Sequence, residues 1–153
     1  MVLKIENVMV SDVITVKAEA TVREAVDIMN KHEIGCLVVV DEEEKPVGVM
    51  TERDLLRRVL AKRKDPVRIK VNQVMSKPII IATPHMELEA AAKLMFEKKI
   101  KKLPVVEDGQ LVGLVTLTDM VRVQPQIIKV LKRLAKAKLP PKRMKKVVDY
   151  YVV

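Results

Sequence analysis

The sequence is poor in aromatic residues and glycine and has a single cysteine. Of its 153 residues, one is Phe, two are Tyr, none is Trp, and four are Gly. Val, Ile, Leu and Met are therefore left to form the core, in which we expect tight aliphatic packing. The single cysteine, Cys36, excludes an intramolecular disulfide, and this fits a reducing compartment; we expect a cytoplasmic protein.

Long apolar runs are also missing. The longest run, residues 35–40, is far shorter than the roughly 18 residues of a membrane span and instead predicts one buried strand. The first six residues contain Lys4 and Glu6 and lack the apolar core of a signal peptide. With 49% hydrophobic residues, the chain is apolar enough to fold, so wholesale disorder is excluded.

Signatures of catalysis are absent from the sequence as well. It has no Gly-x-Ser-x-Gly, no phosphate-binding Gly-x-x-x-x-Gly-Lys-Ser/Thr loop and no Gly-x-Gly-x-x-Gly. His32 and His85 have no Cys or His at metal-ligand spacing, and Cys36 lies in an apolar run that is more typical of a core residue than of a nucleophile. We expect no enzyme, no catalytic cofactor and no metal.

The net charge of +9 lies almost entirely at one end of the chain. Residues 123–153 contain nine of the 29 Lys and Arg residues but one of the 20 acidic residues, Asp149. The preceding 122 residues are nearly neutral. The sequence therefore predicts an ordinary globular body followed by a basic C-terminal extension.

The body repeats itself. Val8-Met9 matches Val74-Met75 at an offset of 66, and residues 48–54 match residues 113–119 at an offset of 65. Neither half is large enough to bury a core well alone, so we expect the two halves to pack together.

In each half, the spacing of the hydrophobic residues predicts the same series of strands and helices. In the first half, Val13–Val16 predicts a strand, and Thr21-x-x-Glu24 is a capping box that begins a helix. Two more strands follow around a charged turn, and Thr51 caps a helix that is expected to bury four residues: Leu55, Leu56, Val59 and Leu60. The second half predicts the same series, with a strand before a helix over about residues 88–98, a turn at residues 108–109 and a final helix from Thr116. The fold class is α/β (α+β), built from two β-α-β-β-α repeats.

One motif occurs in both halves: Gly, two apolar residues, Thr, two further residues and Asp, at Gly48–Asp54 and Gly113–Asp119. Each Thr fits an N-cap, and each Asp completes a variant capping box, which gives the motif a purely structural interpretation. Alternatively, a carboxylate in the first turn of a helix can accept both hydroxyls of a ribose, beside N–H groups that favour phosphate. Two copies at strand ends favour a paired binding site.

In element order, repeat length and this doubled motif, residues 6–122 resemble a tandem pair of CBS (cystathionine-β-synthase) domains, the Bateman module. The resemblance implies repeats at residues 6–63 and 72–122, a linker over residues 64–71, and an extension over residues 123–153. It also implies a pseudo-twofold axis, two clefts, and an adenosyl ligand such as AMP, ADP, ATP or S-adenosylmethionine.

The same resemblance assigns residues to each cleft. One cleft would combine residues from the first motif with residues of the second repeat: Val49, Thr51, Asp54, Ile79, Ile80, Ile100, Lys101 and Lys102. The other would combine Leu114, Thr116, Asp119, Val13, Ile14, Ile34, Gly35 and Cys36. Adenine would lie between aliphatic side chains, and Asp54 or Asp119 would hold the ribose.

The two clefts differ in charge. Lys101 and Lys102 place two cations where the family often binds phosphate, whereas the equivalent Gly35 and Cys36 place none. The Asp54 cleft is therefore expected to prefer a phosphorylated nucleotide, with Arg53 as a further phosphate contact or a solvated surface residue. The Asp119 cleft is expected to be empty or to hold a less charged adenosyl compound.

The basic extension allows several interpretations. Ile127, Ile128, Leu131, Leu134 and Ala135 recur at helical spacing, Pro140-Pro141 ends that helix, and residues 147–153 predict a strand. The extension packs on the module or its dimer mate, or contacts nucleic acid, an acidic protein or an anionic membrane. We expect a non-catalytic regulatory module, as a homodimer, that binds an adenosyl ligand and signals to a partner. The alternative is a nucleic-acid-binding or protein-adaptor role through residues 123–153, with vestigial clefts.

Overall fold

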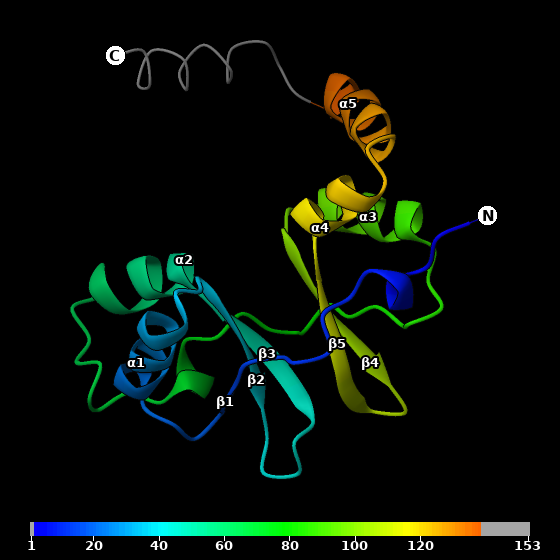
Figure 1. The fold of residues 1–153 in the computed structure, drawn as a ribbon. Helices are drawn as coiled ribbons and strands as arrows, with labels where there is room; N and C mark the ends of the chain where they lie inside the picture. Colours follow the sequence, from blue (N-terminus) through cyan, green and yellow to red (C-terminus); the bar gives the residue numbers. More distant parts are fainter. Residues whose placement is uncertain (1, 139–153) are drawn as a thin grey trace.

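The computed structural model describes residues 2–138, which form two sheet-and-helix units (Figure 1). In the first unit, β1 (Thr15–Lys17) runs parallel to β2 (Cys36–Val40), which pairs antiparallel with β3 (Pro46–Thr51). In the second unit, β4 (Lys102–Glu107) and β5 (Gln110–Thr116) form an antiparallel hairpin. Their turn, at residues 108–109, is where the sequence predicts it.

Each unit carries its own helices. The longer ones are α1 (Val22–His32), α3 (Leu88–Lys98), α4 (Leu117–Val123) and α5 (Ile127–Lys138). A short α2 (Glu52–Asp54) continues into the π-helical segment η2 (Leu55–Leu60), and two 3-10 turns, η1 (Ile5–Asn7) and η3 (Val71–Gln73), precede the units. No helix within residues 2–138 is long and apolar enough to cross a membrane.

The predicted capping box of α1 is confirmed. The Thr21 N–H donates to Glu24 Oε2 over 2.7 Å, and the Glu24 N–H donates to Thr21 Oγ1 over 3.2 Å. These two bonds satisfy N–H groups that have no partner within the helix, and so fix where α1 begins.

The prediction of a strand at the start of the second repeat is wrong. A single parallel bridge, Ala82 to Val105, stands in its place. Ala82 N–H donates to the carbonyl of Pro104, and Val106 N–H donates to the carbonyl of Ala82. The next bond of this ladder would come from the N–H of residue 104, which proline lacks, so the pairing ends there.

The helix that follows β3 also differs from the prediction. Leu56 and Leu60 are 60% and 72% exposed, although the sequence pattern placed both on the buried side; Val59 is buried as expected. The Ala61 N–H bonds to the Leu56 carbonyl, five residues earlier. The wider π-turn shifts the helical period, which leaves the two leucines facing outward.

The segment before each repeat is buried in the other repeat. Ile5 lies in the core of the second unit, with Leu88, Leu103 and Met120. Val71, Val74 and Met75 lie in the core of the first unit, although they precede the second repeat in sequence. The two units are therefore linked by exchanged segments as well as by the connecting chain.

The two motif glycines make room for these crossings. A Cβ on Gly48 would lie 2.6 Å from Met75 Sδ and 3.0 Å from the Ser76 carbonyl oxygen. A Cβ on Gly113 would likewise lie 2.6 Å from Met9 Sδ. Next to each glycine, the crossing segment forms backbone bridges, Val49 with Ser76 and Val10 with Leu114. Both motif glycines therefore lie where a strand and a crossing segment approach too closely for a Cβ.

The described part of the basic extension is α5, which contacts α3. Ile127 is buried in the second core, and Leu131 packs against that core. Hence Ile127 and Leu131 of the predicted helix pack on the module, whereas Ile128 is 39% exposed. Pro140-Pro141 and the strand predicted over residues 147–153 lie outside the described residues.

Candidate functional site

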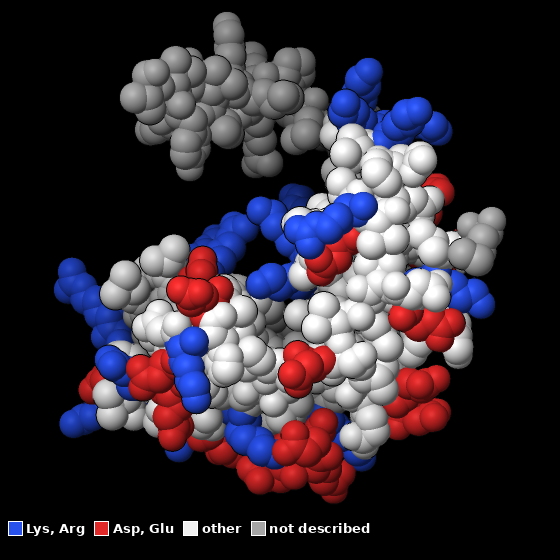
Figure 2. Space-filling model, viewed as in Figure 1, with Lys and Arg blue, Asp and Glu red and all other residues white. Residues whose placement is uncertain are grey.

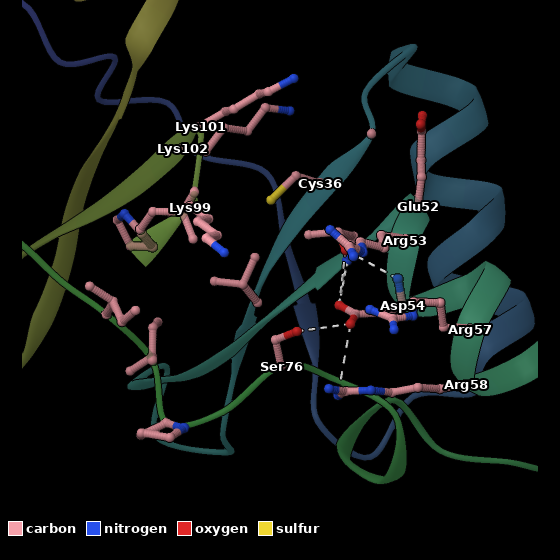
Figure 3. Close-up of a pocket in the computed structure, with 18 residues that line it drawn as sticks. Cys36, Glu52, Arg53, Asp54, Arg57, Arg58, Ser76, Lys99, Lys101 and Lys102 are labelled. Atoms are coloured by element: carbon pink, nitrogen blue, oxygen red, sulfur yellow. Dashed lines mark hydrogen bonds and ion pairs between the residues drawn. The ribbon is translucent and has the colours of Figure 1, made fainter. Parts of the chain in front are cut away.

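A cavity of about 860 Å³ lies between the two units (Figures 2 and 3). All eight residues that the resemblance assigns to the first cleft line it: Val49, Thr51, Asp54, Ile79, Ile80, Ile100, Lys101 and Lys102. They come from β3 and the last residue of α2 in one unit, and from the segment before α3 and the chain between α3 and the first residue of β4 in the other. Residues up to 53 positions apart in sequence thus share one cavity.

Several residues of this cavity were not assigned to it from the sequence. Gly35 and Cys36, which the resemblance gave to the other cleft, line the Asp54 cavity. Arg53, expected either as a phosphate contact of this cleft or as a solvated surface residue, lines the cavity and is exposed. Further lining residues are Glu52, Arg57, Arg58, Ser76, Pro78, Lys99 and Pro104. The positions of Arg57 and Arg58, three and four residues after Asp54, were a signal for two of them, because such residues share a helix face.

Asp54 is the one charged residue that is buried within residues 2–138; it is 6% exposed. Its Oδ2 accepts from the Thr51 N–H over 3.0 Å and from the Thr51 hydroxyl over 3.1 Å, and Asp54 N–H donates to Thr51 Oγ1 over 3.2 Å. The capping interpretation of the motif is therefore confirmed for this copy. It accounts for Oδ2 alone.

The other oxygen of Asp54 faces residues from outside its helix turn (Figure 3). Oδ1 accepts from the Ser76 hydroxyl over 2.8 Å and lies 3.8 Å from Arg58 Nη1. Arg58 Nη1 also donates to the carbonyls of Val74 and Met75, over 3.1 and 2.7 Å. The carboxylate is thus held from two sides, by Thr51 and by Ser76. A carboxylate accepts about four hydrogen bonds and three are used here, so one acceptor position is left for a ligand in the cavity.

The second copy of the motif is held differently. Thr116 Oγ1 donates to Asp119 Oδ2 over 2.6 Å, and Asp119 N–H donates to Thr116 Oγ1 over 3.1 Å. At the repeat offsets, Val10 and Val123 occupy the positions of Ser76 and Arg58, and they are 52% and 49% exposed. Asp119 therefore lacks a counterpart of the Ser76 hydroxyl, and its guanidinium neighbour is Arg122, whose Nη1 lies 3.7 Å from Asp119 Oδ1.

The residues predicted for the Asp119 cleft are not brought together in the cavity. Leu114, Thr116, Asp119, Val13, Ile14 and Ile34 do not line it, and Ile14 and Ile34 pack against the first core. A ligand in the Asp119 cleft stays a prediction.

The walls of the cavity offer two kinds of surface. Val49, Ile79, Ile80 and Ile100 contribute half-buried aliphatic side chains. Cys36, the first residue of β2, also lines the cavity. Its burial raises the pKa of the thiol to about 11, with Asp54 adding to the rise and Lys102 opposing it.

This raised pKa predicts a slow thiol. Because the shift favours the protonated form, thiolate is scarce at pH 7–8, and we expect Cys36 to react with iodoacetamide roughly 300-fold more slowly than free cysteine, whose pKa is about 8.5. The rate should continue to rise as the pH increases toward 11. Alkylation measured by mass spectrometry at several pH values checks this; a rate that levels off near pH 8.5 would contradict it.

Comparison with known proteins identifies this arrangement of repeats. The CBS domain family model matches residues 5–61 and 71–126. The chain belongs to the CBS domain family. Tandem CBS domain proteins are generally regulatory.

The similar proteins include an uncharacterized protein, MK0525, of Methanopyrus kandleri, 40% identical over 118 residues. The match covers 76% of this chain and 60% of that protein's length. The crystal structure of the CBS domain protein TA0289 of Thermoplasma acidophilum, of unknown function, has a TM-score of 0.77 at 33% identity, covering 93% of this chain and 83% of the other.

A second solved structure is informative about ligands. The CBS domain pair of protein MJ0100 was crystallised in complex with 5′-methylthioadenosine and S-adenosyl-L-methionine. It has a TM-score of 0.72 at 29% identity, covering 80% of this chain and 96% of that one. A protein with this fold thus binds adenosyl compounds.

Proposed function

We propose that this CBS pair is a regulatory module that binds an adenosyl ligand in the Asp54 cavity and passes its bound state to a partner. The observation that carries the proposal is the meeting of eight residues from both units in one cavity, among them Asp54, the one buried carboxylate of residues 2–138. Its volume of about 860 Å³ lies in the range of small-molecule sites.

Each part of an adenosyl ligand has a matching surface. Adenine would lie against the aliphatic side chains of Val49, Ile79 and Ile80. A ribose hydroxyl would donate to Asp54, either at its free acceptor position or in exchange for the Ser76 hydroxyl. The hydroxyl of Thr51 lies beside the same carboxylate and offers the sugar a second contact.

Regulation would follow from the position of the cavity. A ligand that contacts residues of both units stabilises the packing in which those residues are close together, and shifts the population toward it. Leu56 and Leu60, exposed on η2, offer an apolar surface for the homodimer that is part of this proposal.

The direct test is to identify what the protein binds. Small molecules released from the purified full chain by heat are identified by mass spectrometry, and AMP, ATP and S-adenosylmethionine are titrated by calorimetry. We expect an adenosyl compound in the released fraction, or saturable binding of at least one of the three. If no adenosyl compound is released and none of the three binds, the proposal is wrong.

A further inference from the structure

The two oxygens of the Asp54 carboxylate differ in how much hydrogen-bonding capacity is left. Within residues 2–138, Oδ2 accepts two bonds, both from Thr51, and is saturated. Oδ1 accepts one bond, from the Ser76 hydroxyl over 2.8 Å, so one acceptor position remains on it. Arg58 Nη1, at 3.8 Å, is beyond hydrogen-bond distance of Oδ1. Because the Thr51 bonds fix the start of α2, a ligand is left with Oδ1.

A ribose presents two neighbouring hydroxyls, and Oδ1 has one position for them. The second hydroxyl can donate to Asp54 only if Ser76 gives up its bond. Ser76 is the donor that comes from outside the α2 turn, and it lines the cavity, where a ligand reaches it (Figure 3). A serine hydroxyl turns away by rotation about a single side-chain bond.

The backbone around Ser76 is held by bonds that do not use its hydroxyl. Arg58 Nη1 donates to the carbonyls of Val74 and Met75, over 3.1 and 2.7 Å. The Ser76 N–H donates to the Val49 carbonyl over 2.8 Å, and the Val49 N–H donates to the Ser76 carbonyl over 3.1 Å. The hydroxyl can therefore leave Asp54 while the crossing segment stays in place.

The second copy of the motif has no such occupant. At the repeat offset, Val10 stands in the position of Ser76, and valine has no hydroxyl to donate. Asp119 Oδ2 accepts the hydroxyl of Thr116, from within its own helix turn. The serine hydroxyl on the carboxylate is thus a feature of the Asp54 cavity and not of the repeated motif.

We infer that Ser76 is a specificity-determining residue whose hydroxyl, in the ligand-free protein, occupies the position on Asp54 that the second ribose hydroxyl needs. This inference rests on the proposed function, because Asp54 is taken to hold the ribose. The bond that the second hydroxyl gains is offset by the Ser76 bond that is lost. The cavity therefore distinguishes a ribonucleotide from its 2′-deoxy form by less than about 3-fold, although its carboxylate is buried.

The test titrates AMP, ATP and their 2′-deoxy forms by calorimetry into the full chain and into Ser76→Ala. In the variant both ribose hydroxyls find a free acceptor position, so AMP and ATP should bind about 3- to 10-fold more tightly than to wild type. The 2′-deoxy forms should change by less than about 2-fold, since one position already suffices for them. Ser76→Thr keeps the hydroxyl and should match wild type. Ser11→Ala removes the hydroxyl of the other serine, outside the cavity, and should change neither.

A thermal measurement separates this role from a purely structural one. Without ligand, Ser76→Ala should lower the Tm, because the bond to Asp54 is lost. With saturating AMP or ATP at equal concentration, the two proteins should have the same Tm, because the bond is already open in the liganded wild type. A Tm difference that persists unchanged with ligand would mean that Ser76 only stabilises the fold.

The outcomes also separate this inference from the proposed function. If Ser76→Ala weakens the binding of AMP and ATP, the serine contacts the ligand directly; the inference is wrong and the proposed function stands. A preference for ribose over 2′-deoxyribose that is the same in wild type and Ser76→Ala also contradicts the inference alone. If Asp54→Ala binds AMP and ATP as wild type does, Asp54 does not hold the ribose, and both are wrong.

Discussion

The Asp54→Ala variant is expected to bind its adenosyl ligand roughly 10- to 150-fold more weakly than the wild-type chain. Asp54 is the buried carboxylate of the cavity, and the variant loses its hydrogen bond to the ligand. A hydrogen bond to a charged group contributes about 1.5–3 kcal/mol, which corresponds to this loss of affinity. Calorimetric titration of AMP and ATP measures the change. Asp54 also accepts two hydrogen bonds from Thr51, so its removal could disturb the fold. Circular dichroism and the Tm therefore have to show that the variant is folded.

Asp119→Ala is the matched control. Asp119 occupies the same motif position and also bonds to its threonine, but it does not line the cavity. Its removal should leave binding in the Asp54 cavity within about 2-fold of wild type. A folded Asp54→Ala protein with normal binding would mean that Asp54 serves the helix start alone.

The second large effect is expected from Leu37→Ala. Leu37, in β2, is 0% exposed and belongs to the core of the first unit. Replacing such a leucine by alanine removes apolar contacts and leaves a cavity, so we expect the free energy of unfolding to fall by about 2–5 kcal/mol. For a chain of this size, that corresponds to a Tm lower by roughly 4–20 °C. Urea denaturation followed by circular dichroism measures it.

Leu56→Ala makes the same chemical change at an exposed position. Leu56 is 60% exposed, so we expect its removal to change the free energy of unfolding by at most about 0.5 kcal/mol. A loss as large as that of Leu37→Ala would show that Leu56 is buried in the folded protein in solution.

The repeats and most elements could be predicted from the sequence because they follow from local patterns. The helix over residues 88–98 and the cap at Thr21 are set by side-chain period and by hydrogen bonds three residues apart. The shortened first strand of the second repeat depends on a hydrogen bond from residue 104 to a distant segment, which no local pattern contains. The exposure of Leu56 and Leu60 follows from a π-turn that an α-helical period does not anticipate.

The cavity was foreseen through the family resemblance rather than through residue patterns. Residues before and after α3 reach Asp54 because the units pack together, and this packing is long-range. Ser76 was missed because its approach to Asp54 depends on the crossing beside Gly48. Arg57, Arg58 and Lys99 were missed for the same reason, since the arginines and the lysine lie on different repeats.

The exchange of segments between the units has a consequence for synthesis on the ribosome. Ile5 is among the first residues made, yet its neighbours in the core include Met120 and Ile127, near the far end of the described chain. The first unit in turn awaits Val71 and Val74 before its core closes. The first core is complete once Val74 and Met75 have been made, whereas Ile5 has no core to enter until the segment with Met120 and Ile127 has emerged, so its apolar side chain stays exposed for most of synthesis.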